Sequence, residues 1–470
     1  MINFSIIDIL TIVFFFCLLL FFGFLPSKKK YTGAEDYLLS NRKVGLTLFV
    51  LTNVATWYGG ILGVGEFTYR YGLLSWLTQG VPYYIFAIIF AFLFAKKIRN
   101  ASLFTIPEKI EQVYGKKVSI LAAVLIFILV SPAPYILMVG NLISIIFNID
   151  LFWALFFGTL VSVIYLFFGG YRSDLFTDAF QFFIMFIGFI ILLLFSFSTF
   201  GGLDYLEINL PETHLEVFGG ASPLYIIVWF FIALWTFADP GFHQRCYAAK
   251  TSSVAFKGIL ISIIFWFLFD FLTTSTGLYS KAALTNIKNP MLAYPMYADK
   301  ILPIGLKGIF FSALFATILS TLNSFLFLSA TTFSRDFILK FKKNTKVDKT
   351  IFYTRIGLVV SSLIAIIFAC IAQSVISLWY SIGSLCIPAL ILLVVTSYYE
   401  KFKVQSQIAF ISTIIVSLFG IIWLIARNYL PANSWLFEIE PMLVGLFIGI
   451  CLFMFSSIFS KFIMPKRIKN

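Results

Sequence analysis

Charged side chains are scarce in this sequence. Only 12% of its 470 residues are charged, whereas 60% are hydrophobic and the mean hydropathy is +0.98. Soluble domains carry about 25% charged residues, so this composition excludes a soluble globular protein. A strict alternation of polar and apolar residues is lacking as well, for example in the apolar run from Phe182 to Phe195, and this excludes a transmembrane β-barrel.

Residues that usually carry enzyme or redox chemistry are also few. The two histidines, His214 and His243, both fall in predicted loops with no nucleophile pattern around them. We therefore do not expect an enzyme, for example an intramembrane acyltransferase. The five cysteines show no CxxC pair and no metal-ligand spacing, so the sequence predicts no disulfide framework.

Apolar runs of about 20 residues recur along the whole chain, and each is long enough to cross a bilayer. We expect an all-α polytopic membrane protein with about 13 transmembrane helices, folded as a single transmembrane domain over 1–470. The predicted helices are 5–25, 46–70, 73–95, 118–146, 151–170, 174–199, 223–240, 258–280, 304–333, 351–372, 375–398, 406–427 and 440–460.

The formal net charge is +13, but Lys and Arg lie at the ends of apolar runs and form no patch interleaved with aromatic residues. We therefore expect these charges to meet a lipid bilayer and not nucleic acid. Their uneven distribution predicts a cell-membrane protein with its N-terminus outside and its C-terminus in the cytoplasm. In this orientation the only external basic residues are Arg70, Lys281, Lys288, Lys300, Lys307 and Arg427.

Glycine and proline interrupt two of the predicted helices. Gly59 and Gly60 lie inside the second, and Asp239 and Pro240 lie at the inner end of the seventh. In the predicted topology these helices lie five apart and run in opposite directions, which is typical of an inverted repeat with two broken helices. The expected parts are an extra N-terminal helix at 5–25, a 5+5 inverted-repeat core at 46–398 and two extra C-terminal helices at 406–460.

Five motifs follow one another within residues 30–400. They are EDYLLSNRKVG, LGVGEFTYRYG, GGYRSDLFTDAFQ, HQRCYAAKTSSVAFKG and ATILSTLNSFLFLSATTFSRD. In these motifs the chain resembles the sodium:solute symporter family. The resemblance implies a leucine-transporter-like fold and a symporter that imports a small organic solute together with sodium ions by alternating access.

The ninth predicted helix carries a column of hydroxyl groups. Thr317, Ser320, Thr321 and Ser324 recur at i, i+3, i+4 and i+7, so they share one helical face. Such groups often only join helices or bond the carbonyl one turn back, but oxygen ligands also suit hard cations. The resemblance implies a main sodium site made by the hydroxyls of Ser320 and Thr321 and the carbonyls of Thr317, Asn53 and Thr56. Some family members carry an aspartate where this chain has Ala55.

Carboxylates inside the predicted helices are the next signal, because charged groups are costly in hydrocarbon. Asp174 and Asp178 share one face of the sixth predicted helix. We interpret Asp174 as a first-turn residue that the helix dipole stabilises. For Asp178, the resemblance implies a second sodium site formed by Asp178, Ser320, Asn323 and Ser324.

Aromatic residues close to the predicted helix breaks indicate where a solute binds. The predicted substrate-binding residues are Trp57, Tyr58, Gly59, Trp235, Asp239 and Tyr380. The Asp239 carboxylate could meet a substrate amine, a proton or Arg245. Asp270 lies in the middle of the eighth predicted helix and receives no role. Glu66 and Arg70 are four residues apart and are predicted to form a local pair.

Two alternatives to sodium-coupled transport remain open. The same fold could couple transport to protons through Asp178 or Asp239, although protons do not need a column of hydroxyls. A transporter-like membrane sensor belongs to a different class, and the short tail after Lys461 carries no signalling module. Family members handle sugars, amino acids, carboxylates, vitamins and urea, and the sequence does not choose among these solutes.

Overall fold

In the computed structural model of this chain, the described residues are 2–28, 30–341, 349–371, 375–431 and 434–463. Side chains are described for these residues except at 375–377, 379–380 and 457–463. This part of the chain is almost entirely helical and contains no β-strand, apart from one isolated bridge between Val44 and Ala249. The expected all-α architecture is confirmed.

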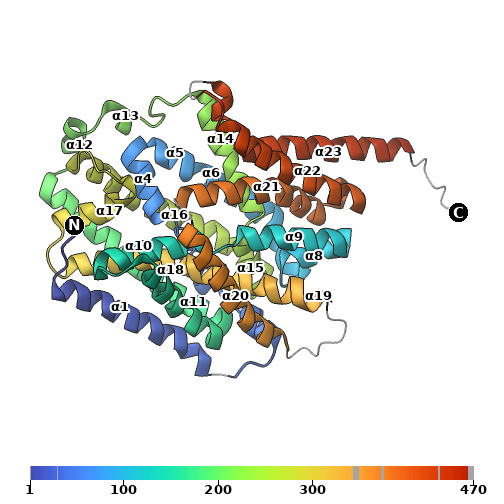
Figure 1. Cartoon of the computed structure of the whole chain (residues 1–470), viewed down its shortest axis with the longest axis horizontal. Coiled ribbons are helices and arrows are strands. Elements are labelled where there is room, and N and C mark those ends of the chain that lie inside the picture. The colour runs from blue at the N-terminus through green and yellow to red at the C-terminus, as the bar shows by residue number, and fades with distance from the viewer. Residues whose placement is uncertain (1, 29, 342–348, 372–374, 432–433, 464–470) are drawn as a thin grey trace.

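The helices form one bundle, drawn in Figure 1. Their bounds are α1 Ile6–Phe24, α2 Ala34–Leu39, α3 Leu46–Ala55, α4 Ile61–Tyr71, α5 Leu74–Gln79, α6 Val81–Phe90, α7 Lys96–Ala101, α8 Ile106–Tyr114, α9 Lys116–Leu129, α10 Ala133–Phe147, α11 Leu151–Phe200, α12 Leu203–Asn209, α13 Glu212–Leu215, α14 Pro223–Ile232, α15 Pro240–Ala248, α16 Ser252–Ala283, α17 Ala293–Ile301, α18 Leu306–Thr331, α19 Leu339–Phe341, α20 Lys349–Ile371, α21 Val375–Tyr398, α22 Ser406–Arg427 and α23 Pro441–Ile463.

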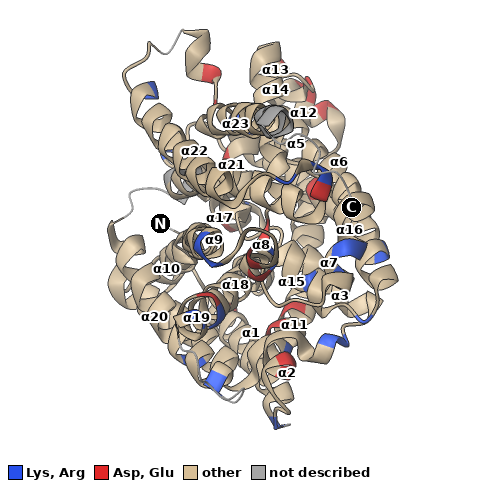
Figure 2. Ribbon diagram, turned by 90° about the vertical axis from the view of Figure 1, so that its right-hand side faces the viewer, with Lys and Arg blue, Asp and Glu red and all other residues tan. Residues whose placement is uncertain are grey.

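Ten helical segments of the described chain are long and apolar enough to cross a membrane. The expected count of 13 stays a prediction, because several predicted helices are broken or merged. α11 joins two of them at Gly170, which has φ +50°, and a Cβ there would lie 2.7 Å from the ring of Tyr37. Charged residues are sparse along the ribbons in Figure 2, in keeping with a lipid-embedded bundle.

α18 is the most deeply buried long helix and packs against α11, α1 and α20. Its burial explains why its polar residues matter, since hydroxyls inside a bundle must find partners in the protein. By contrast, large apolar side chains on the outer helices are exposed, for example Phe14 on α1 and Leu194 on α11. These side chains face the region that lipid would occupy.

Both predicted helix breaks are present. α3 ends at Ala55 and α4 begins at Ile61, and a Cβ at Gly59 would lie 2.4 Å from the Cβ of Thr321. Glycine is therefore needed for α18 to approach this break. The second break ends with Asp239, whose carboxylate accepts a hydrogen bond of 2.9 Å from the amide of Phe242.

The prediction of a loop after Pro240 is wrong, because residues 240–248 form the buried helix α15. Proline at the first position and an aspartate N-cap both favour a helix start here. The predicted fourth helix at 118–146 is in fact two helices, α9 and α10, separated around Pro132. The segments expected as external loops at 200–222 and 281–303 contain α12, α13 and α17.

Candidate functional site

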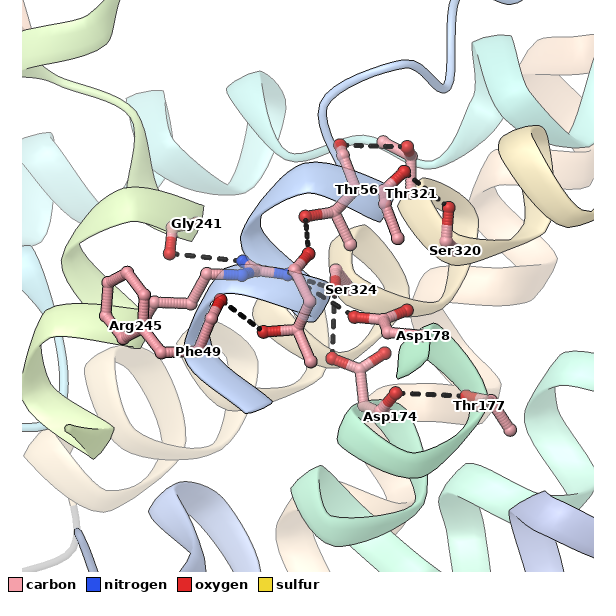
Figure 3. A network of polar contacts seen from close by, with 12 residues as sticks. Phe49, Thr56, Asp174, Thr177, Asp178, Gly241, Arg245, Ser320, Thr321 and Ser324 are labelled. Atoms are coloured by element: carbon pink, nitrogen blue, oxygen red, sulfur yellow. Dashed lines mark hydrogen bonds and ion pairs between the residues drawn. The ribbon is translucent and has the colours of Figure 1, made fainter. Parts of the chain in front are cut away.

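The hydroxyl groups of α18 meet the break between α3 and α4. The Ser320 Oγ donates to the carbonyl of Ala55 at 2.8 Å and to that of Thr317 at 3.0 Å. The Thr321 Oγ1 donates to the carbonyl of Thr56 at 2.9 Å (Figure 3). The hydroxyl pair predicted for the main sodium site therefore lies beside backbone carbonyls of the broken helix.

The break also changes the backbone hydrogen bonds of α3. The amide of Trp57 donates to the carbonyl of Val54, three residues back, at 3.2 Å. The carbonyl of Asn53, four residues back, therefore does not receive this donor. Carbonyls released at an unwound helix are suitable ligands for a cation. Sequence reasoning missed the carbonyl of Ala55, because a backbone ligand depends on the path of the chain and not on the side chain.

An arginine lies next to the residues predicted for the second sodium site. The Arg245 Nη2 is 3.5 Å from the Asp178 Oδ2 and donates to the Ser324 Oγ at 3.2 Å. Ser324 in turn donates to the Asp174 Oδ2 at 2.9 Å (Figure 3). Sequence reasoning placed Arg245 in a loop, and its position in α15 explains why its role was missed. Its ion pair is with Asp178, whereas the Asp239 carboxylate caps α15.

This cluster contains two carboxyl groups and one guanidinium. Asp174 and Asp178 are fully buried, and among the described residues Arg245 forms an ion pair with Asp178, while Ser324 links it to Asp174. Several buried polar atoms here make no hydrogen bond with described residues, namely the Asp174 Oδ1, both carboxylate oxygens of Asp178 and both amide atoms of Asn323 and of Gln181. Buried polar atoms normally have partners, so a bound cation would suit this cluster.

A cavity of about 310 Å³ adjoins Thr321. Thr56 and Thr321 form part of its wall, and it extends to Glu440, just before α23. Four of the six residues predicted to bind substrate line it: Trp57, Tyr58, Trp235 and Asp239. Gly59 instead packs against Thr321, and the side chain of Tyr380 lies outside the described residues.

Other residues that line the cavity were not predicted from the sequence. Those with aromatic rings are Phe67, Trp76, Tyr83, Tyr135, Trp229 and Phe325, and Asp270 is a further carboxylate. In a chain with 19% aromatic residues, composition gives no reason to choose these rings over the others. Only their packing around the two helix breaks brings them together.

On the other side of Asp239 the chain is closely packed. The hydroxyls of Tyr247 and Tyr398 lie 3.0 Å apart. The Arg42 Nη1 donates to the carbonyls of Leu103 at 3.0 Å and Tyr247 at 3.1 Å. These contacts join α15, α21 and the segment before α3 at the end of the bundle that is predicted to face the cytoplasm.

The remaining predicted polar residues have structural partners. The Arg70 Nε lies 3.0 Å from the Glu66 Oε1, which confirms the predicted local pair. His214 lies on α13 with its Nε2 3.2 Å from the carbonyl of Tyr69, and burial lowers its pKa. The His243 Nε2 lies 3.0 Å from the carbonyl of Phe237.

Known proteins resemble this chain in sequence. High-affinity choline transporter 1 of Drosophila melanogaster is 25% identical over 409 residues, which cover 80% of this chain and 64% of the transporter's length. Sodium/proline symporter 2 of Staphylococcus saprophyticus is 24% identical, and the match covers 96% of this chain and 93% of the symporter. The sodium/glucose cotransporter of Vibrio parahaemolyticus is 26% identical, with 78% and 75% covered.

Solved structures show the same fold. A Na⁺-coupled sialic acid symporter in a substrate-bound outward-open state matches with a TM-score of 0.82 at 14% identity, over 100% of both chains. Mhp1, a nucleobase-cation-symport-1 family transporter, matches with a TM-score of 0.57 at 12% identity, over 91% and 95%. At these identities the likeness establishes only the leucine-transporter-like fold. The model of the sodium:solute symporter family matches residues 37–416, and the chain therefore belongs to this family.

Proposed function

We propose that this protein is a sodium-coupled symporter that imports a small organic solute by alternating access, and that it has no catalytic role. The observation that carries the proposal is the meeting of two α18 hydroxyls, of Ser320 and Thr321, with carbonyls at the α3–α4 break. A hard cation takes such oxygens as ligands without a fixed charge beside it.

The main sodium ion is held by the hydroxyls of Ser320 and Thr321 and by the carbonyls of Asn53, Thr56 and Thr317. At present the hydroxyls donate hydrogen bonds to nearby carbonyls. When a cation binds, the hydroxyl hydrogens turn away and both kinds of oxygen face the ion. The second sodium ion lies among Asp178, Ser320, Asn323 and Ser324, and the buried atoms of Asp178 and Asn323 that make no hydrogen bond support a cation there.

Sodium binding and solute binding are coupled because the two sites have residues in common. Thr56 and Thr321 belong both to the proposed ion site and to the lining of the cavity. An ion that orders these residues raises the affinity for the solute, and the solute must raise the affinity for the ion by the same factor. Trp57, Tyr58, Trp235 and Asp239 form the solute site, with Gly59 setting the path of the break and Tyr380 as a further predicted contact.

The arrangement of the cavity supports alternating access. The cavity reaches Glu440, which is predicted to lie on the external side, whereas Arg42 and the Tyr247–Tyr398 pair join segments that are predicted to lie on the cytoplasmic side. The protein lies in the cell membrane with its N-terminus outside, so the solute enters from the external side. The repeat core spans 46–398, with the extra helices at 5–25 and 406–460 outside it.

The names of the relatives give choline, proline and glucose as the first solutes to assay. Proton coupling through Asp178 or Asp239 and a sensor without transport remain the alternatives. The hydroxyl pair at the carbonyls favours sodium, because a proton needs one acceptor and not a cage of oxygens.

Sodium binding to the purified protein tests the proposal. Sodium chloride should raise the melting temperature above that in equimolar potassium chloride, because a ligand that binds only the folded state stabilises it. The double variant Ser320→Ala, Thr321→Ala should lose this rise. Ser312→Ala is the matched control, because Ser312 is also buried in α18 but donates only to the carbonyl of Gly308. Equal melting temperatures in the two salts would contradict the proposal.

A further inference from the structure

The charge of the cavity wall limits which solutes can bind there. None of the described residues that line the cavity is Lys, Arg or His, whereas Asp239, Asp270 and Glu440 are acidic. Glu440 is paired, since its Oε1 lies 3.2 Å from the Arg427 Nη1. Asp239 accepts a hydrogen bond from the amide of Phe242 at the start of α15. Asp270 lies in the middle of α16, and its carboxylate accepts from the hydroxyl of Tyr84 and forms no ion pair with a described residue.

Asp270 is held in a defined position within α16. The hydroxyl of Tyr84 donates to its Oδ2, and the Trp76 Nε1 donates to the Tyr84 hydroxyl at 3.2 Å. A Cβ at Gly80 would lie 2.9 Å from the Asp270 Oδ2, so the glycine between α5 and α6 leaves room for the carboxylate. A carboxylate at this depth is costly unless a proton or another cation accompanies it.

Aromatic rings line the same cavity as Asp270. Four tryptophans line the cavity, namely Trp57, Trp76, Trp229 and Trp235. The rings of Trp57 and Tyr83 are 5.2 Å apart and nearly perpendicular, and Trp235 packs directly on the backbone of Gly383, where a Cβ would lie 2.7 Å from its ring. Tryptophan faces attract cations most strongly of all side-chain rings, and cages of them recognise quaternary ammonium groups.

We propose that the transported solute is a small organic cation, an amine or a quaternary ammonium ion, whose charge is balanced by Asp270 and whose alkyl groups lie against the tryptophan faces. This inference rests on the proposed function and adds the chemical class of its solute. An anionic solute would meet an uncompensated carboxylate and no basic residue. A neutral sugar would bring no charge for Asp270, which would then need a proton or a sodium ion.

Binding of two isosteric probes to the unaltered protein tests this inference. The (2-hydroxyethyl)trimethylammonium ion and 3,3-dimethyl-1-butanol have nearly the same shape, but only the first is charged. In sodium chloride, we expect this cation and tetramethylammonium to raise the melting temperature in a saturable way, and the neutral isostere, glucose and proline to leave it unchanged. Equal stabilisation by the isostere, or stabilisation by none of the cations, overturns the inference.

Variants of two aspartates test whether Asp270 supplies the counter-charge for the bound cation. Asp270→Asn should weaken cation binding at least about tenfold, because it removes the counter-charge while keeping the shape. Asp204→Asn is the control, since Asp204 is an exposed acid on α12 away from the cavity. If Asp270→Asn instead leaves cation affinity unchanged and abolishes a pH dependence of uptake, Asp270 is a proton site and the inference fails. Without solute, sodium should still raise the melting temperature of Asp270→Asn, because Asp270 is not a proposed sodium ligand. If sodium does not raise the melting temperature of the unaltered protein, the proposed function fails, whatever the result for organic cations.

Discussion

Helical spacing placed Ser320 and Thr321 in a column of hydroxyls, and the family resemblance implied that these two bind sodium. The structure brings both hydroxyls to the broken helix. Replacing either one by alanine removes one oxygen ligand and leaves the packing of α18 nearly intact. We expect Ser320→Ala and Thr321→Ala each to raise the sodium concentration for half-maximal uptake about 3- to 10-fold, the range that corresponds to one lost polar interaction. Uptake measured across a sodium titration, with Ser312→Ala as control, checks this. If both variants are expressed normally and show unchanged sodium dependence, Ser320 and Thr321 are not sodium ligands.

A variant of Asp178 tests how many sodium ions are transported with each solute. If its carboxylate helps to hold a second ion, uptake by the unaltered protein should depend on sodium with a Hill coefficient above one. Asp178→Asn should bring the coefficient close to one, because the variant keeps the size of the side chain and removes its charge. Measuring initial uptake rates against sodium concentration decides the matter. A coefficient near one in the unaltered protein would show that the second ion is absent.

Site residues that lie on one helix could be predicted from the sequence, whereas those that meet through packing could not. Hydroxyls at helical spacing can be found in a sequence because they lie on one element. Arg245 and the carbonyl of Ala55 could not be found in this way, since each meets its partner only through packing between distant segments. Asp270 was noticed because a carboxylate is rare inside an apolar helix, but the partner Tyr84 is 186 residues away.

Helical elements were predicted best where composition is uniform. α22 has the expected bounds, 406–427, because an apolar run ends cleanly at Arg427. α15 was missed because its sequence, PGFHQRCYA, is polar for a buried helix and follows a proline. The interruption around Pro132 was missed because the run is apolar on both sides of it.

The close approach of α18 to the α3–α4 break predicts the effect of a substitution at Gly59. A methyl group there would lie 2.4 Å from the Thr321 Cβ and 2.7 Å from the ring of Tyr135, so Gly59→Ala must push α18 away from the α3–α4 break. We expect a loss of about 1–3 kcal/mol in the free energy of unfolding, as for other overpacked sites, together with weaker sodium stabilisation. Thermal unfolding with and without sodium measures both effects.

Gly45→Ala is the control for Gly59→Ala, since a Cβ at Gly45 meets nothing within 4 Å and its backbone is extended. Its sodium response should match that of the unaltered protein. If Gly59→Ala also keeps the full sodium response, the break does not contribute ligands in the way proposed.

Alternation between two states of the whole molecule predicts that Cys246 becomes reactive. This cysteine is fully buried on α15, beside the contacts of Arg42 and Tyr247 that close one end of the bundle. Arg42→Ala removes these hydrogen bonds and should increase the population of the state open at that end about tenfold. In a background that lacks the other four cysteines, the rate of N-ethylmaleimide labelling of Cys246 should rise accordingly, and sodium should lower it.

Arg70→Ala is the control for this experiment, because Arg70 pairs with Glu66 on α4 and is predicted to lie on the external side. Its labelling rate should equal that of the unaltered background. A Cys246 rate that responds neither to Arg42→Ala nor to sodium would mean that this end does not open during transport.

Uptake into proteoliposomes tests the central claim of sodium coupling most directly. A tenfold sodium gradient supplies about 1.4 kcal/mol and a potential of 100 mV about 2.3 kcal/mol per charge, so each ion can drive accumulation several hundredfold. With an inward sodium gradient and equal pH on both sides, solute should accumulate, and more so when the interior is negative. The drive through the main sodium site should persist from about pH 6 to 8, because its hydroxyl and carbonyl ligands do not titrate there. Accumulation driven by a pH gradient in the absence of sodium would contradict the account.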